Sequence, residues 1–247
     1  MIDIDADDPT AYGHAFADVY DEWYHDLGDA GLVVAALNQR CPPPRRGLLE
    51  LGIGTGRLAI PLSEAGWEVT GIDASAEMLR QLGAKRGAQQ VACILGDVAD
   101  PAAWPTDRYD IVLAAFNLVF NITARSRQQQ LITLAAEHLT SRGLLVIETD
   151  LITPSGTGAR HTSPSRVVEG VTIETVIDPL NQLIDGTHRG AGRDRPWRLR
   201  YLNTDQLDAM ATVAGLELAD RTEGWSGATG TSGPPRSYVS FYRLNRR

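Results

Sequence analysis

Between residues 47 and 148 the chain alternates short apolar runs with amphipathic stretches, and this rhythm constrains the fold more than any other feature. The apolar runs predict strands at 47–51, 67–72, 91–95, 109–115 and 144–148. The amphipathic stretches predict helices at 57–65, at 75–82 with Ser75 as cap, and at 127–139. Strands and helices that alternate in this way form a parallel sheet with helices on both faces. We therefore expect an α/β fold.

The segments on either side of this alternation predict a helical cover and a β-rich insertion. Residues 1–45 contain two helical pieces between 11 and 40, which three consecutive prolines end. Residues 153–168 are rich in Ser, Thr, Gly and Pro and predict a loop, and β-like runs follow at 171–177, 182–187 and 197–202. A helix at 205–214, capped by Thr204, and strands at 216–221 and 237–242 restore the alternation. We expect 46–152 and 203–247 to form the α/β core and 153–202 an antiparallel β lid, since about fifty residues exceed an ordinary loop.

Composition argues against several classes of protein. A formal net charge of −8 is unsuited to a surface that tracks nucleic-acid phosphates. No apolar run approaches the roughly 20 residues of a membrane-spanning helix, and the acidic N-terminus is unlike a signal peptide. Cys41, Cys93 and the five histidines show no disulfide or metal-ligand spacing. We expect a soluble cytoplasmic protein without nucleic acid, membrane or metal as partner, and the sequence leaves a homodimer open.

A glycine-rich turn follows the first predicted strand of the core. Gly52, Gly54 and Gly56 lie between that strand and the helix that begins at Arg57. Glycines at such a turn let the backbone approach a ligand, toward which the amides of the helix N-terminus point. A tight turn without any ligand would use the same residues, so the motif needs support from the strands that follow.

Two acidic residues close the next two predicted strands. Asp73 follows the run at 67–72, where a carboxylate can accept both hydroxyls of a ribose. Asp97 follows the run at 91–95, where it can reach an adenine edge while Val98 packs on the ring. Because the carboxyl ends of successive parallel strands form one crevice, the turn and the two acids together predict a site for a nucleotide-like ligand.

The spacing of the glycines discriminates between two such ligands. The dinucleotide fingerprint G-x-G-x-x-G requires a glycine where this chain has Arg57. Glu50, at the start of the turn, suits a ligand that carries an amino group and a sulfonium better than a pyrophosphate. NAD is therefore the weaker candidate.

The runs ELGIGTGR, GIDAS, GDVAD, YDIVLAAF and HLTSRGLLVIE resemble the motif series of the class I, Rossmann-like S-adenosylmethionine-dependent methyltransferases, over roughly residues 46–150. The resemblance implies a seven-stranded, mostly parallel sheet whose last strand is antiparallel, and S-adenosylmethionine as cofactor. It implies that the glycine turn holds the methionyl portion, Asp73 the ribose and Asp97 with Val98 the adenine, while Ala115 and its neighbours lie beside the sulfonium. The expected cofactor-binding residues are Tyr12, Tyr20, Glu50, Gly52, Gly54, Gly56, Arg57, Asp73, Ala74, Met78, Asp97, Val98, Ala114 and Phe116.

A narrower resemblance concerns the start of the chain and the insertion. The run AYGHAFADVYDEWYHD and the β-rich insertion resemble small-molecule N-methyltransferases of the glycine and amino-sugar type. In those enzymes tyrosines of the N-terminal helix close over the cofactor, and Tyr12 and Tyr20 have the matching spacing, although helix packing alone would explain both. Amino-sugar enzymes often carry a histidine shortly after the fourth strand, where this chain has Asn121.

The expected function is methyl transfer to a small-molecule acceptor, with an amine favoured and natural-product biosynthesis as a setting. Alignment alone can supply on the order of 7–11 kcal/mol of the barrier, and a general base adds about 10²–10⁴-fold, so a missing base motif does not argue against an enzyme. The candidate catalytic residues are Tyr20, Asn121 and Asp150; Glu148 and Asp150 suit a cationic amine, a base or a loop cap. The alternatives are an NAD-dependent oxidoreductase and a non-catalytic S-adenosylmethionine-binding module.

Overall fold

A seven-stranded sheet forms the centre of the molecule. The computed structural model describes residues 8–24, 30–44, 46–152, 158–168, 170–190, 192–227 and 237–245. The strand order is β10-β11-β5-β4-β1-β2-β3; β11 runs antiparallel to β10 and β5, and the other neighbouring pairs are parallel. This confirms the predicted topology. The strands are β1 (Gly47–Leu51), β2 (Glu68–Asp73), β3 (Ala92–Leu95), β4 (Tyr109–Ala114), β5 (Leu139–Asp150), β10 (Leu216–Glu223) and β11 (Ser237–Leu244).

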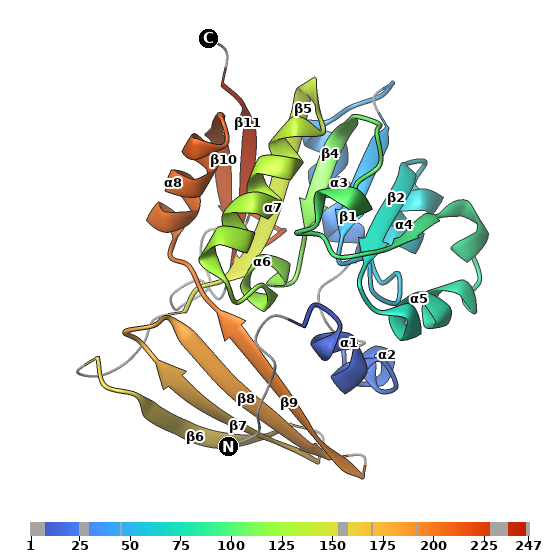
Figure 1. The fold of residues 1–247 in the computed structure, drawn as a ribbon. Helices are drawn as coiled ribbons and strands as arrows, with labels where there is room; N and C mark the ends of the chain where they lie inside the picture. The colour runs from blue at the N-terminus through green and yellow to red at the C-terminus, as the bar shows by residue number, and fades with distance from the viewer. Residues whose placement is uncertain are drawn as a thin grey trace.

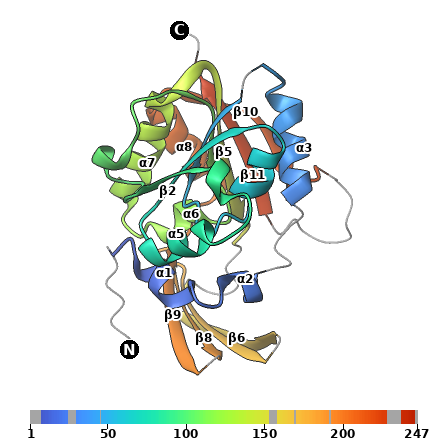
Figure 2. The same cartoon turned by 90° about the vertical axis from the view of Figure 1, so that its right-hand side faces the viewer.

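Helices cover both faces of this sheet, as Figures 1 and 2 show. One face carries α3 (Ala30–Arg40), α4 (Ala59–Glu64) and α5 (Ala76–Gly83), and the other carries α6 (Leu118–Asn121), α7 (Arg125–Glu137) and α8 (Thr204–Val213). Short 3-10 turns, η1 (Ala88–Gln90) and η2 (Pro101–Ala103), flank β3. Two separate clusters of buried apolar side chains result, one on each face, which is the packing expected of parallel strands buried on both sides.

Some boundaries differ from those that the sequence predicts. β5 begins at Leu139 rather than at residue 144, directly after α7. The cap of α8 is Asn203 rather than Thr204: its side chain accepts a hydrogen bond from the Gln206 amide at 2.8 Å, and Gln206 Oε1 accepts one from the Asn203 amide at 3.1 Å. This reciprocal pair is a capping box. Among the described residues, no helix is both long and apolar enough to span a bilayer.

The insertion is a four-stranded antiparallel sheet rather than three strands. Its order is β6 (His161–Val168), β7 (Val171–Asp178), β8 (Leu183–Gly190) and β9 (Arg193–Arg200). The prediction of a loop up to residue 168 is therefore wrong for 161–168. β6 is an edge strand whose register shifts between Ser163 and Arg166, around Pro164. Proline is tolerated at such an edge, and the irregularity removes the alternation that would have marked a strand.

The N-terminal cover, residues 11–24, lies between the insertion and the core. It contains α1 (Ala11–Phe16) and α2 (Tyr20–Trp23), whereas the sequence predicts one unbroken helical piece here. Both views place α1 between β9 and α5 (Figures 1 and 2). The break falls at residues 17–19, where the Ala17 carbonyl accepts a hydrogen bond from the Gln81 side chain of α5. A contact to the core thus replaces a helical hydrogen bond.

Candidate functional site

A cavity opens at the carboxyl ends of β1, β2, β3 and β4, and the cover and β9 close over it. Most of the residues that the sequence predicts for the site line this cavity, and they come from α1, α2, β1, β2, α5, α6 and the loops that follow β1, β2, β3 and β4. The exceptions are Gly56, Ala114 and Asp150. The predicted residues that line it are Tyr12, Tyr20, Glu50, Gly52, Gly54, Arg57, Asp73, Ala74, Met78, Asp97, Val98, Phe116 and Asn121.

The glycine turn adopts a backbone conformation that only glycine reaches easily. Gly52, Gly54 and Gly56 have φ values of +66°, +55° and +81°. A Cβ on Gly52 would lie 2.5 Å from Leu118 Cδ1. A Cβ on Gly56 would lie 2.9 Å from the Leu82 side chain of α5, so this glycine serves helix packing rather than the cavity wall.

Asp73 ties the glycine turn to the end of β2. Its Oδ2 accepts a hydrogen bond from the Gly54 amide and its Oδ1 one from the Ser75 amide, both at 2.8 Å. Burial raises the pKa of Asp73, and these two amides oppose that shift. Since a carboxylate oxygen can accept more than one hydrogen bond, Asp73 retains the capacity to accept from the hydroxyls of a ligand.

Glu50 is a buried acid of the site whose carboxyl group is not fully hydrogen-bonded within the described residues. The residue is 4% exposed, and Oε2 has no hydrogen-bond partner in the described part of the chain. Burial raises its pKa to about 8; Arg57 opposes this rise and Asp73 adds to it. A buried acid on a cavity wall with an unsatisfied oxygen and a shifted pKa is the environment that a cationic ligand group would complete.

Asp97 lies at the opposite end of the cavity, beyond β3. Its Oδ2 pairs with the Arg127 guanidinium of α7, and its Oδ1 accepts a hydrogen bond from the Ala99 amide at 2.8 Å. Val98 beside it is buried and lines the cavity. The sequence analysis missed Arg127, because nothing in its local pattern distinguishes it from any polar residue of a surface helix.

Three tyrosines of the cover, Tyr12, Tyr20 and Tyr24, cluster together, and the first two line the cavity with Arg57. The ring centroids of Tyr12 and Tyr20 lie 6.5 Å apart, and those of Tyr20 and Tyr24 lie 5.0 Å apart. Burial raises the pKa of Tyr20 to about 12, although Arg57 acts against it. The Tyr20 hydroxyl therefore stays protonated near neutral pH, which suits a hydrogen-bond donor rather than a general base.

The turn after β4 is strained and points Phe116 at the cavity. Phe116 and Asn117 have φ values of +49° and +60°, a region that non-glycine residues rarely occupy. The end of β5 holds this turn, because Glu148 Oε2 accepts a hydrogen bond from the Phe116 amide at 2.9 Å. Such strain persists only where surrounding contacts enforce it, and it is frequent at functional sites.

The acids at the end of β5 thus hold the turn and do not reach the cavity. Asn117 Nδ2 donates to Asp150 Oδ2 at 2.9 Å, and the Asp150 amide donates back to Asn117 Oδ1 at 2.7 Å. The second oxygen of Glu148 accepts from Trp225 Nε1 at 2.7 Å. The structure places Asp150 outside the cavity that Tyr20 and Asn121 line.

The lid contributes cavity residues that the sequence pattern did not assign to the site. Pro196, Trp197 and Arg198 of β9 line the cavity, as does Thr123, and β9 contacts α6. Among the described residues, no group of histidine, cysteine and acidic side chains is arranged to hold a metal ion.

Comparisons with known proteins show that the chain is similar to methyltransferases. A family model described as a methyltransferase domain matches residues 48–143. The solved structure of the CcbJ methyltransferase from Streptomyces caelestis is 34% identical, superposes with a TM-score of 0.82, and covers 97% of this chain and 100% of its own. The cypemycin N-terminal methyltransferase of a Streptomyces species is 26% identical over 219 residues, which are 85% of this chain and 89% of that protein. DesVI of Streptomyces venezuelae, 19% identical with a TM-score of 0.64 over 93% of this chain and 98% of its own, shares the fold.

Proposed function

Because the chain belongs to the S-adenosylmethionine-dependent methyltransferases, we propose that it transfers the methyl group to an amine of a small molecule. One observation supports an amine in particular. The described residues that line the cavity include no histidine and no lysine. Its acids are Asp8, Glu50, Asp73 and Asp97. We assign the last three to the donor, and Asp8 is an exposed residue whose Oδ1 accepts hydrogen bonds from the amide and the hydroxyl of Thr10.

The donor half of the cavity fits S-adenosylmethionine. The unsatisfied Glu50 carboxyl suits the ammonium of the methionyl portion, the glycine turn leaves room for its backbone, and Asp73 suits the ribose hydroxyls. We assign Asp97 and Val98 to the adenine end. The bound cofactor supplies the methyl group on a positively charged sulfur that leaves as a neutral thioether.

The chain's own residues then align the acceptor and exclude water. Tyr20 and Phe116 border the space that the acceptor must enter, and Trp197 closes it from the lid. An amine that arrives uncharged carries its own lone pair, so it needs alignment rather than a strong base, and its proton can leave to solvent after transfer. An alcohol would need a general base, for which the described lining of the cavity offers no histidine or lysine. The proposal that the acceptor is a small molecule rests on a cavity that the cover and β9 close over, and one relative's description as an N-terminal methyltransferase supports nitrogen as the target.

Pairs of matched acceptors test whether nitrogen or oxygen receives the methyl group. The protein is incubated with methyl-labelled S-adenosylmethionine and a panel of short peptides, amino sugars and cyclic amines, each beside its N-acetylated form or its isosteric alcohol. We expect label only in the free amines, and a rate that rises with pH along the titration of the acceptor's own amine. Label in the alcohols and not in the amines would overturn the proposal. A homodimer and a cytoplasmic location stay predictions, which sedimentation and cell fractionation, respectively, would test.

A further inference from the structure

Three side chains of β9 face the N-terminal cover. Arg193, Arg195 and Trp197 occupy alternate positions of the strand, so they project from the same face. Trp197 packs against the apolar cluster that Phe16 forms with Met78 of α5. The two arginines reach the backbone and the carboxylate of the cover. β9 therefore presents two cations and an indole to a segment about 180 residues earlier in the chain.

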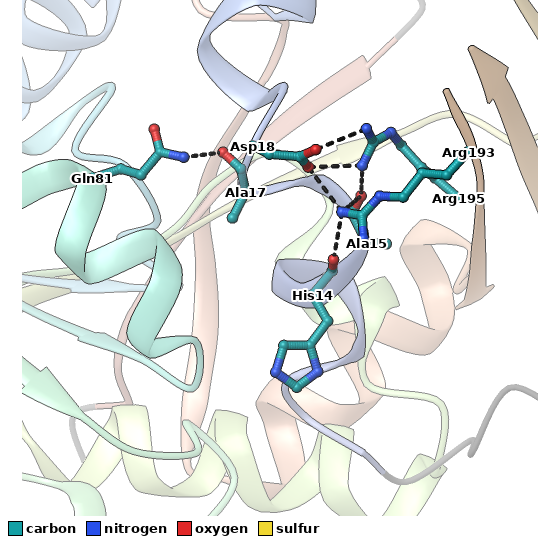
Figure 3. A network of polar contacts seen from close by, with 7 residues as sticks. All are labelled: His14, Ala15, Ala17, Asp18, Gln81, Arg193 and Arg195. Atoms are coloured by element: carbon teal, nitrogen blue, oxygen red, sulfur yellow. Dashed lines mark hydrogen bonds and ion pairs between the residues drawn. The ribbon is translucent and has the colours of Figure 1, made fainter. Parts of the chain in front are cut away.

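Both guanidinium groups converge on Asp18, in the break between α1 and α2 (Figure 3). Arg195 binds both carboxylate oxygens, with Nη1–Oδ1 at 2.7 Å and Nη2–Oδ2 at 2.9 Å. Arg193 Nη2 lies 2.9 Å from Asp18 Oδ1. Arg195 Nη1 also donates to the Ala15 carbonyl at 2.6 Å. The bidentate pairing of Arg195 with Asp18 is the strong form of this interaction.

Arg195 is an unusual residue to bury at this position. Its side chain is 1% exposed, whereas that of Asp18 is 54% exposed. Its Cζ lies 5.2 Å from the centroid of the Trp23 ring, and its Nε has no partner among the described residues. A buried guanidinium is costly without its counter-ion, and an apolar residue of similar size would often pack at least as well. Arg195 is thus committed to Asp18 and to the cover.

The opposite side of the cover is attached to the core beside the glycine turn. Gln81 of α5 donates to the Ala17 carbonyl (Figure 3). Asp21 accepts a hydrogen bond from Thr55 Oγ1 at 2.6 Å and pairs with Lys85 Nζ at 2.6 Å. Thr55 lies between Gly54 and Gly56. Residues 17–21 therefore bridge the lid and the turn that we assign to the methionyl portion of the donor.

We propose that Arg195 and Asp18 form a latch between the lid and the cover, which holds Tyr12 and Tyr20 over the methyl donor and slows the donor's exit. α1 has six residues and α2 has four, and helices this short are not stable by themselves. Their position therefore depends on contacts with β9 and α5. Arg195 does not line the cavity and acts through the cover, so it is a positioning residue. The latch rests on the donor site proposed above.

Dissociation of labelled S-adenosylmethionine from the full chain, chased with unlabelled donor, measures the latch. The variants are Asp18→Asn, Arg195→Met and the double substitution. The matched control is Arg189→Met, which removes an arginine of β8 that pairs with Glu174 and Asp194 on the exposed part of the lid. We expect the dissociation rate to rise about tenfold or more in each latch variant, since the loss of a charged pair acts mainly on dissociation. The double variant should be no faster than the faster single one, and the control should stay within about twofold of wild type.

Two further readouts separate a latch from a general loss of structure. Hydrogen exchange of residues 11–24 should rise in the latch variants while that of residues 46–150 stays unchanged, and KM for the donor should rise without a matching fall in kcat. If Arg195→Met fails to fold, Asp18→Asn still decides, because Asp18 is half-exposed. Wild-type dissociation in a folded Asp18→Asn variant overturns the latch, whether or not its cover exchanges faster. A wild-type protein that binds no donor refutes the proposed function instead.

Discussion

The two walls of the cavity are built in different ways. The wall that we assign to the methyl donor (the donor wall) is local: Glu50, the glycine turn and Asp73 lie within 24 residues of one another, and the backbone amides of Gly54 and Ser75 fix the Asp73 carboxylate. The cover wall is not local. Its principal contact joins Asp18 to Arg195, 177 positions away, through side chains alone.

This difference suits the two walls to different tasks, since one can hold a ligand in a fixed geometry and the other can move. Groups on strand ends and main-chain amides of a central sheet hold a ligand in a fixed geometry, because the core would have to open for them to move. Short helices held by ion pairs and by one aromatic cluster can leave without disturbing that core, and local opening of this kind has a low free-energy cost. The donor wall is suited to recognition, and the cover wall to admission and release.

Gly52→Ala is expected to produce the largest effect on the donor wall. The new Cβ would require an alanine at φ +66° and would lie 2.5 Å from Leu118 Cδ1. A strained backbone costs of order 1–3 kcal/mol, and the displaced turn also loses its approach to the donor. We expect calorimetry to show donor affinity reduced by at least about 100-fold.

Gly66→Ala is the matched control for this substitution. Gly66 has φ +90° with open space around the position of a Cβ, and it does not line the cavity. It shares the backbone strain but not the contact with Leu118, so it should lower the melting temperature less than Gly52→Ala does and leave donor affinity unchanged. Equal affinities of the Gly52 variant and the wild type would show that the donor does not approach the turn.

Glu50→Gln is expected to have the next largest effect on affinity. The substitution keeps the size of the side chain and removes the charge that we assign to the donor's ammonium. A hydrogen bond to a charged group contributes about 1.5–3 kcal/mol, so donor affinity should fall roughly 10–100-fold at pH 8. Affinity of the wild type should rise as the pH increases through about 8, where the buried acid ionises. A wild-type affinity that stays flat across this range would contradict the assignment.

The same substitution should stabilise the ligand-free protein. Below the ordinary pKa of a glutamate both folded and unfolded chains hold the Glu50 proton, so wild type and variant should melt alike. As the pH rises toward 8 the unfolded chain ionises freely, whereas burial keeps the proton on the folded one. The wild type therefore loses stability over this interval and Glu50→Gln does not. Thermal melts at about pH 4 and about pH 8, without donor, measure the difference.

The sequence brought most of the residues that we assign to the donor wall to one cavity, because this wall is local. The glycine spacing, Asp73 and Asp97 are written in the order in which parallel strands end, and the strand order follows from the alternation. The contacts that hold the cover and the lid could not be predicted, because each depends on a pair of residues that lie far apart in the sequence. Arg127 and Arg195 look like ordinary surface residues until the fold places Asp97 and Asp18 beside them. Likewise β6 has no alternation, since its proline and its register shift belong to an edge strand.

The acids after β5 show that a residue's position at a strand end does not by itself reveal its role. A strand end beside the cavity predicted Asp150 as a catalytic residue, yet its carboxylate pairs with Asn117 and holds a strained turn. The sequence could not show that Phe116 and Asn117 would adopt left-handed conformations. A turn of that kind needs an enforcing partner, and the nearest strand provides it.

Asp150→Asn should therefore have the smallest effect of the substitutions considered. An asparagine oxygen can still accept the hydrogen bond from Asn117 Nδ2, and the Asp150 main-chain amide that donates to Asn117 Oδ1 is unchanged. We expect kcat to fall less than about fivefold, with the pH profile of kcat unmoved, whereas loss of a general base would cost about 10²–10⁴-fold and remove a limb of that profile. Asn117→Ala, which breaks the same pair from the other side, should lower kcat more than Asp150→Asn does, and adding Asp150→Asn to it should cost little more. A loss of kcat above 100-fold in Asp150→Asn alone would show that Asp150 takes part in catalysis and that the end of β5 belongs to the site that the acceptor occupies.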